Sequence, residues 1–216
     1  ATALHRSISE YARGRLLDLG CGNVPLYDVY RSLVDNITCV DWSNSGHNLR
    51  HVDLAMDLNK ALLFKSESFE TVILTDVLEH ISEPEFLIGE IHRVLTSSGV
   101  LIGTVPFMYR LHEEPHDYFR YTEHALRHFA NRNCLLVERL EAYGHGTDVF
   151  FDVIGKLLIT MHWRFGPILA SLCQKIGLWI RSTNLGRWLN RSAQTMPLGY
   201  VFVFRAMPQS VAPNDS

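Results

Sequence analysis

The sequence predicts an α/β fold in which helices cover both faces of a mostly parallel β-sheet. Apolar runs of strand length alternate with helical repeats along the chain, and the run ETVILTD at residues 70–76 is continuously apolar between its ends. Such runs are typical of strands buried on both faces. Alternating strands and helices imply right-handed crossovers and parallel strands. The 216 residues, 47% of them hydrophobic, suffice for one sizeable core.

Strands and helices are predicted in order from these local signals. Pro25 suits the first turn of a helix, Thr122 suits an N-cap, and Gly99 suits the end of a helix. The predicted strands cover residues 15–20, 36–42, 70–76, 100–107, 134–143 and 198–206. The predicted helices cover residues 4–13, 25–34, 83–99 and 122–133, and two or three more are expected within 149–190.

Charge and cysteine usage exclude several classes of protein. The net charge is -3 and no basic run occurs, so a nucleic-acid partner is not expected. Four cysteines without CxxC spacing indicate a reduced, intracellular chain. A signal peptide and a transmembrane span are not expected either, because no segment has the pattern of one. A cytoplasmic location follows as an expectation.

The segment LLDLGCGNVPLY at residues 16–27 is the first candidate site. Gly20 and Gly22 fall where the first strand ends, and glycine lets backbone approach a ligand closely. Asp41 ends the second strand, 23 positions after Asp18, where an acidic side chain can bind ribose hydroxyls. Pro25 replaces a third glycine, which argues against a dinucleotide pyrophosphate. The alternative is a plain strand-to-helix turn.

These motifs, together with the run from MDL at residue 56 to VPF at residue 107, resemble class I S-adenosylmethionine-dependent methyltransferases. The resemblance covers roughly residues 14–143. It implies a Rossmann-like fold with a seven-stranded sheet and a helical insert between the last two strands. Val24 stands where that family has a further glycine, and Glu70 stands where aspartate is usual.

The resemblance also implies the cofactor-binding residues. Asp18, Gly20 and Gly22 would contact the methionine part of S-adenosylmethionine, and Asp41 would hold the ribose. The remaining implied contacts are Trp42 at the adenine, Asp57 and Leu58 at the adenine edge and face, and Asp76 near the methyl-transfer channel. Asp41 and Asp57 could instead serve turns, Trp42 could simply pack, and Asp76 could cap the helix that begins at Val77.

Candidate bases for the methyl acceptor follow the fourth and fifth strands. Glu79 and His80 come directly after the fourth strand, and the segment MYRLHEEPHDYFRYT follows the fifth. Because histidine titrates near neutral pH, the predicted catalytic residues are His112 and His116, with Asp117 as orienting residue.

Arg120 is expected to anchor an anionic group of the acceptor. The alternatives for this segment are a hydrogen-bonded cap and a metal site made by His112, His116 and Asp117. A metal is not predicted, because that spacing suits a helix better than a segment containing Pro115. The pattern HEEPHDYFRYT also resembles a segment of bacterial methyltransferases associated with polysaccharide biosynthesis.

The expected domains are a methyltransferase core at residues 1–148 and 195–207, a helical insert or lid at 149–194, and a disordered tail at 208–216. The insert is rich in basic residues, with Asp152 the only acid. Seven of its residues share one helical stripe: Ile168, Leu169, Leu172, Cys173, Ile176, Trp179 and Ile180. This stripe could cover the core, form a homodimer contact or lie at the inner membrane surface.

The expected function is therefore S-adenosylmethionine-dependent O-methylation of a sugar or glycan intermediate, which could be lipid-linked, with S-adenosylhomocysteine as product. One alternative is a methyltransferase that acts on a phenol, quinone or amine. The other is a cofactor-binding subunit without catalytic activity that supports a partner.

Overall fold

The structure is a computed structural model, and it describes residues 2–43, 49–160, 164–193 and 195–208. The expected disordered tail lies outside the described residues except for Pro208, as do residues 161–163 and 194 of the expected insert.

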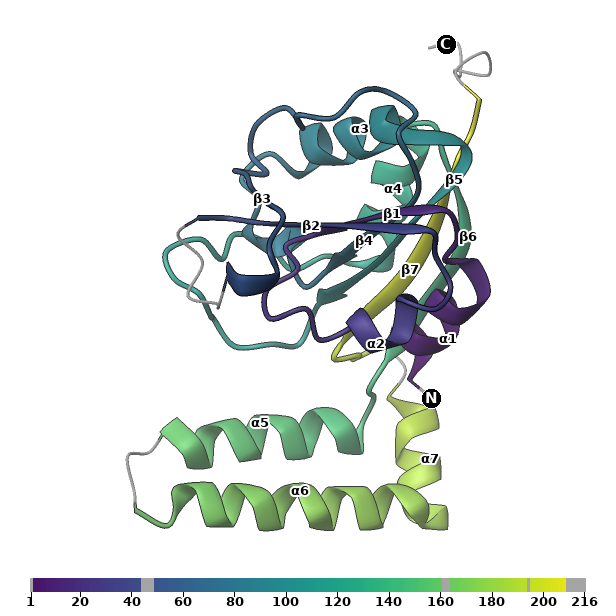
Figure 1. The fold of residues 1–216 in the computed structure, drawn as a ribbon. Helices are drawn as coiled ribbons and strands as arrows, with labels where there is room; N and C mark the ends of the chain where they lie inside the picture. Colours follow the sequence, from purple (N-terminus) through teal and green to yellow (C-terminus); the bar gives the residue numbers. More distant parts are fainter. Residues whose placement is uncertain (1, 44–48, 161–163, 194, 209–216) are drawn as a thin grey trace. The chain divides into compact units, whose positions relative to one another are not determined.

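A seven-stranded sheet organises the chain, as the sequence predicts (Figure 1). Its order is β3-β2-β1-β4-β5-β7-β6. The strands are β1 (Arg15–Leu19), β2 (Asn36–Asp41), β3 (Leu54–Ala55), β4 (Phe69–Thr75), β5 (Leu95–Pro106), β6 (Leu135–Tyr143) and β7 (Gly199–Ala206). The pairs β1–β2, β2–β3, β1–β4 and β4–β5 are all parallel. The predicted Rossmann-like fold with a mostly parallel sheet is confirmed.

The order of the strands places a ligand site at the carboxyl ends of β1 and β4. After β1 the chain moves outward to β2 and β3, and it then returns to place β4 on the other side of β1. This reversal is the topological switch point, where open α/β sheets bind ligands. Continuous burial explains why these strands are central, since Leu16, Leu17, Ile73 and Leu74 have no exposed surface.

Helices of the sheet unit cover the two faces (Figure 1). On one face lie α1 (Ala3–Tyr11) and α2 (Tyr27–Tyr30), and on the other lie α3 (Pro84–Val94) and α4 (Glu123–Arg132). Two short 3-10 helices, η1 (Leu49–His51) and η2 (Leu78–His80), follow β2 and β4. The predicted N-cap of α4 is confirmed, because the Thr122 hydroxyl accepts a hydrogen bond from the Ala125 N–H.

Two helices end earlier than the sequence pattern predicts. The helix expected over 25–34 is only Tyr27–Tyr30, and the chain turns before β2, where the Asp35 N–H bonds the Gly14 carbonyl. The helix expected to close at Gly99 ends at Val94. Leu95 is extended and pairs with Phe69 of β4, so burial of Leu95 in the sheet outweighs continuation of the helix.

The chain divides into two compact units. The sheet unit comprises Ala1–Val105, Leu111–Glu141 and Val201–Ser216, and the helical unit comprises Pro106–Arg110 and Ala142–Tyr200. The helical unit contains α5 (Thr147–Thr160), α6 (Gly166–Ser182) and α7 (Asn184–Ser192). None of the helices in the described part of the chain has the length and apolar content needed to cross a bilayer.

Small residues bring α5 and α6 together. A Cβ on Gly177 would lie 2.7 Å from Cγ of Phe151, so only glycine permits this approach. The seven residues of the predicted stripe lie on α6, where they divide between two environments. Leu169, Cys173 and Ile180 are half-buried. The other four are exposed: Ile168, Leu172, Ile176 and Trp179.

Candidate active site

The loop after β1 has the conformation that its glycines allow. Gly20 and Gly22 both have positive φ, at 71° and 53°. A Cβ on Gly20 would come within 2.3 Å of Cγ2 of Val77, which follows β4. Val24 also has a positive φ of 52°, so the backbone keeps a glycine-like conformation at a position where the sequence carries valine. At Gly20 and Gly22 this loop therefore presents only backbone atoms at the switch point.

Asp41 joins the end of β2 to this loop. Its Oδ2 accepts a hydrogen bond of 2.6 Å from the Gly22 N–H, and its Oδ1 accepts one from the Trp42 N–H. The Asp41 side chain is buried, whereas Trp42 is 38% exposed. Asp41 therefore stabilises the turn, as the alternative for this residue suggested. Each of its carboxylate oxygens still has a lone pair that can accept a hydrogen bond from a ligand.

Asp18 is buried within β1 and bonded to α2. The Tyr30 hydroxyl donates a hydrogen bond of 2.8 Å to its Oδ2. Burial raises the pKa of the Asp18 carboxyl to about 6, and this effect exceeds the lowering by the Tyr30 hydrogen bond.

This raised pKa of Asp18 makes folding stability depend on pH. Between about pH 4 and pH 6 the folded state keeps a proton on Asp18 that the unfolded state has lost. The free energy of unfolding of the wild type should therefore fall as pH rises through this window, by up to about 3 kcal/mol, relative to Asp18→Asn. Urea unfolding of both proteins from pH 4 to pH 7 measures the difference, and a difference that is flat with pH would contradict the assignment.

Asp76, Asp57 and Leu58 are the other residues that the resemblance implies for the cofactor. Asp76 follows β4 with a φ of 51°, and its Oδ1 accepts a hydrogen bond of 3.0 Å from the Thr104 hydroxyl of β5. It does not cap η2, whose N-cap is Val77 without a side-chain bond. Asp57 accepts a hydrogen bond from the Asn59 N–H, and Leu58 is buried.

Residues 111–121, which we term the β5 loop, are hydrogen-bonded to η2. The Tyr118 N–H donates to the Glu79 carbonyl at 2.8 Å, and the Tyr121 hydroxyl donates to the Leu78 carbonyl at 2.9 Å. Nδ1 of His80 lies 2.7 Å from the His116 carbonyl oxygen. Since β4 and β5 are parallel neighbours, the segments that follow them meet at one edge of the sheet.

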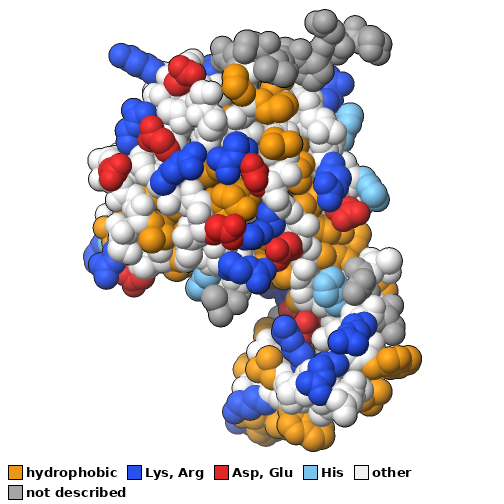
Figure 2. Space-filling model, turned by 90° about the vertical axis from the view of Figure 1, so that its right-hand side faces the viewer, with side chains coloured by type: hydrophobic (Ala, Val, Ile, Leu, Met, Phe, Trp, Pro, Cys, Tyr) orange, Lys and Arg blue, Asp and Glu red, His pale blue; other side chains and the backbone are white. Residues whose placement is uncertain are grey.

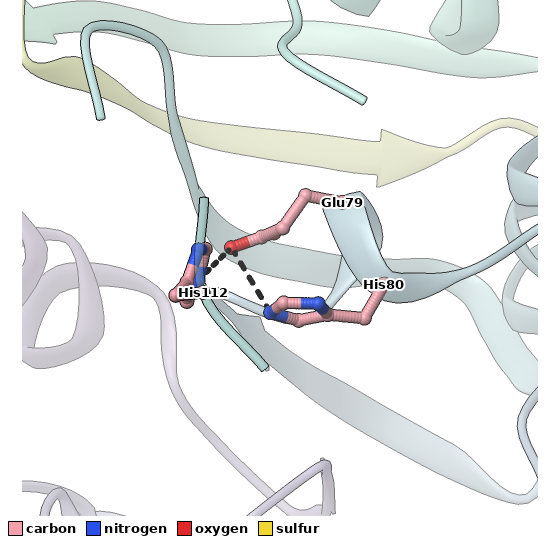
Figure 3. A group of neighbouring side chains, drawn as sticks. All are labelled: Glu79, His80 and His112. Atoms are coloured by element: carbon pink, nitrogen blue, oxygen red, sulfur yellow. Dashed lines mark ion pairs between the residues drawn. The ribbon is translucent and has the colours of Figure 1, made fainter. Parts of the chain in front are cut away.

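Glu79, His80 and His112 come together at this edge (Figure 3). Nε2 of His80 lies 3.8 Å from Oε1 of Glu79, and Nε2 of His112 lies 3.7 Å from the same oxygen. Glu79 has no exposed surface, and neither of its carboxylate oxygens has a hydrogen-bond partner among the described residues. Burial raises the pKa of the Glu79 carboxyl to about 8. We call these three residues the Glu-His-His cluster.

Asp117 contacts His112 at Nδ1, the ring nitrogen that does not face Glu79. Its Oδ2 lies 3.2 Å from Nδ1 of His112 and accepts the His112 backbone N–H at 3.0 Å. Arg120 binds both carboxylate oxygens of Asp117 at 2.5 and 2.7 Å and holds the pKa of that carboxyl well below its usual range. Asp117 therefore orients His112, while the guanidinium of Arg120, expected to anchor an acceptor, binds Asp117.

The side chain of His116 lies next to Trp42 and outside the cluster, although its backbone carbonyl contacts His80. Its ring is 5.4 Å from the Trp42 ring, edge to face, and its Nδ1 lies 2.9 Å from the Tyr118 hydroxyl. The sequence names His112 and His116 together, whereas the fold groups His112 with Glu79 and His80. The signal for this grouping is the position of Glu79 and His80 directly after β4, the strand that neighbours β5.

Comparisons with known proteins bear on the fold and on the class of enzyme. Residues 17–103 match the model of a methyltransferase domain family. A putative methyltransferase from Bacillus halodurans is 12% identical with a TM-score of 0.60, covering 96% of this chain and 100% of that one. The [4+2]-cyclase SpnF is 20% identical with a TM-score of 0.61, covering 94% and 80%. No curated protein matches the sequence.

A further similar structure is a phosphoethanolamine N-methyltransferase 2 from Haemonchus contortus in complex with S-adenosylhomocysteine. It is 16% identical with a TM-score of 0.58, covering 97% of this chain and 53% of that one. At these identities the structures demonstrate a shared fold. The fold is the one that these methyltransferases share. Together with the family match, this fold identifies the chain as a methyltransferase that uses S-adenosylmethionine.

Proposed function

We propose that S-adenosylmethionine lies across the carboxyl ends of β1, β2 and β4. Its ribose hydroxyls would bind Asp41, and its adenine would lie between Trp42 and the Asp57–Leu58 pair. Its methionine part would pass the backbone of Gly20 and Gly22 toward Asp76. Asp18 would interact with the methionine ammonium group directly or through a water molecule. The support is the bare loop at the switch point, with Asp41 bonded to it.

We propose that the chain transfers the methyl group to a hydroxyl oxygen at the Glu-His-His cluster. The hydroxyl oxygen forms a bond to the methyl carbon, the carbon–sulfur bond breaks, and its electron pair neutralises the sulfonium to give S-adenosylhomocysteine. The hydroxyl proton must leave, so a basic group near the oxygen is required. The observation that carries this proposal is the convergence of Glu79, His80 and His112 beside Asp76, at the ends of β4 and β5.

A sugar or glycan hydroxyl is the acceptor that we propose. The β5 loop combines acids and histidines with the exposed rings of Tyr118 and Phe119. Polar groups and flat apolar rings together suit a ligand with many hydroxyls and apolar ring faces. A phenol, a quinone or an amine, and a subunit without activity, are the alternatives.

An acceptor panel tests this proposal. The protein is incubated with S-adenosylmethionine carrying a tritiated methyl group and with sugar nucleotides, lipid-linked glycan precursors, phenols or amines. We expect label in a sugar product. Label only in a phenol or amine would overturn the acceptor class, and cofactor binding with no product in any class would favour the subunit without activity.

The His116→Ala variant separates the two histidines of the β5 loop. Because the side chain of His116 contacts Trp42 rather than the cluster, we expect its loss to weaken binding of S-adenosylhomocysteine by about 3- to 10-fold, as for one aromatic contact. Turnover at saturating cofactor should change less than binding. Calorimetry and initial rates measure the two effects. A large loss of turnover with unchanged binding would restore His116 as the catalytic base.

We also propose that the helical unit contacts an anionic membrane surface, which would bring a lipid-linked acceptor to the enzyme. Residues 142–200 contain six lysines and arginines and two aspartates. Hydrophobic and basic side chains adjoin on the face of this unit visible in Figure 2. Large apolar side chains are exposed on all three helices: Phe150, Leu157, Ile168, Leu172, Trp179, Leu185 and Trp188. Basic amphipathic helices bind such interfaces.

Vesicle sedimentation tests this contact. We expect binding to vesicles of phosphatidylglycerol and phosphatidylcholine, and little binding to phosphatidylcholine alone. Lys175→Glu changes the charge by two units, so at about 1 kcal/mol per charge it should weaken binding by about 30-fold. Trp179→Ser should also weaken binding, because it removes a large exposed apolar side chain. Leu63→Ser is the matched control, because Leu63 is an equally exposed apolar side chain in the sheet unit. Equal binding by all variants, or none by the wild type, would exclude the membrane contact.

A further inference from the structure

The Glu-His-His cluster has the chemistry of a metal site, and we propose that Glu79, His80 and His112 bind one divalent transition-metal ion. This inference rests on the proposed position of the acceptor at the cluster and deepens it, because it says how a hydroxyl could lose its proton there. Two imidazole nitrogens and one carboxylate oxygen are a set that binds catalytic zinc and related ions.

The spacing of the three donor atoms fits an ion between them. Oε1 of Glu79 lies 3.8 Å from Nε2 of His80 and 3.7 Å from Nε2 of His112. All three ligand atoms lie within 4.8 Å of one another. Donor atoms bound to one tetrahedral zinc ion at about 2.0–2.1 Å are about 3.3 Å apart. The two distances from Glu79 exceed this value by about 0.5 Å or less, and the separation of the two histidine donors exceeds it by about 1.5 Å at most, so small side-chain rotations would complete the geometry.

A hydrogen bond behind His80 and an ion pair behind His112 favour the ring form that a metal needs. Nδ1 of His80 lies 2.7 Å from the His116 carbonyl, which can only accept, so this nitrogen carries a proton. Nδ1 of His112 faces the Asp117 carboxylate at 3.2 Å, which favours a proton there as well. In each neutral ring the lone pair then lies on Nε2, directed at Glu79. Carboxylates and backbone carbonyls commonly support metal-binding histidines in this way.

The burial of Glu79 is a second observation that points to a cation, and it is independent of the spacing of the donor atoms. Its carboxylate has no exposed surface and no hydrogen-bond partner among the described residues, and its Oε1 faces His80 and His112 (Figure 3). A buried polar group without a partner costs roughly 1–3 kcal/mol, and more if it is charged. A cation at this position would compensate that cost.

A bound ion would give the cluster a defined role in the proposed reaction. As a Lewis acid it would lower the pKa of an acceptor hydroxyl, which would then attack the methyl group as an alkoxide. The proton would pass to solvent or to an acidic side chain near the site. Glu79, His80 and His112 would act as ligands, and Asp117 would act as a positioning residue through His112.

Cobalt titration of the chelator-treated full-length chain tests the proposal without any acceptor. We expect binding of one Co²⁺ with visible absorption bands, displacement by Zn²⁺, and an increase in Tm with either ion. Glu79→Gln, His80→Ala and His112→Ala should each lower the affinity for the ion by at least 10-fold, and Asp117→Asn by about 10-fold. His124→Ala, which removes an exposed histidine of α4, should bind as the wild type does.

The outcomes distinguish a failure of the metal proposal from a failure of the proposed methyl transfer. Absence of binding, or binding that survives Glu79→Gln in a folded protein, would overturn the metal proposal and leave a protonated ion-pair cluster. Glu79→Gln keeps the size of the side chain and removes a buried carboxylate, so it should fold. Metal binding at the cluster with no methylated product from any acceptor would leave the metal site standing and refute the proposed function.

Discussion

Asp41→Ala is expected to weaken the binding of S-adenosylhomocysteine by at least 100-fold. In the proposed complex both ribose hydroxyls donate to this carboxylate, and hydrogen bonds to a charged group contribute about 1.5–3 kcal/mol each. The substitution also removes the acceptor of the Gly22 N–H, so the glycine loop loses its bond to β2. Calorimetric titration with S-adenosylhomocysteine measures the loss directly, and Tm measurement in the absence of ligand shows whether the fold is retained.

Two further variants make this result specific. Asp35→Ala removes an exposed carboxylate just before the opposite end of β2, so it should leave cofactor affinity unchanged. Asp41→Asn keeps an acceptor for one backbone N–H and should show a smaller loss than Asp41→Ala. An unchanged dissociation constant for Asp41→Ala, in a folded protein, would refute the ribose assignment.

Glu79→Gln is expected to lower kcat by about 10²- to 10⁴-fold with little change in cofactor affinity. Glu79 lies beyond the end of β4, at the proposed acceptor site, and the side chains of His80 and His112 face it. The loss is expected whether the carboxylate takes up the proton itself or binds the proposed ion. His112→Ala should have an effect of the same order, because both residues belong to one cluster.

His124→Ala serves as the control for these variants, since His124 is an exposed histidine of the same unit outside the cluster. Rates are measured at saturating S-adenosylmethionine, so that a change in binding does not lower them. A wild-type kcat in Glu79→Gln would show that the cluster takes no part in the reaction. Another side chain of the β5 loop would then be the base.

The sheet and its ligand edge could be predicted from sequence because their signals are local. RLLDLG and ETVILTD are apolar runs whose burial on both faces follows from composition, and Gly20 and Gly22 mark a turn with positive φ. The early end of α3 could not be predicted, because it depends on the pairing of Leu95 with Phe69 across the sheet. Helical periodicity contains no information about that pairing.

The grouping of the candidate catalytic side chains was harder to predict for a similar reason. Residue spacing places His112, His116 and Asp117 together, but three-dimensional proximity depends on which strands are neighbours. Since β4 adjoins β5, Glu79 and His80 meet His112, while His116 reaches Trp42. The role of Arg120 likewise depends on its contact with Asp117, which becomes visible only when the β5 loop is folded.

The crystal structure of the chain with S-adenosylhomocysteine is the most direct test of the central claim. We predict that the ribose hydroxyls lie within hydrogen-bond distance of the Asp41 carboxylate, the amino-acid part along Gly20 and Gly22, and the sulfur toward the Glu79–His80–His112 side of the site. A nucleoside bound elsewhere, or a sulfur directed away from those three side chains, would contradict the account.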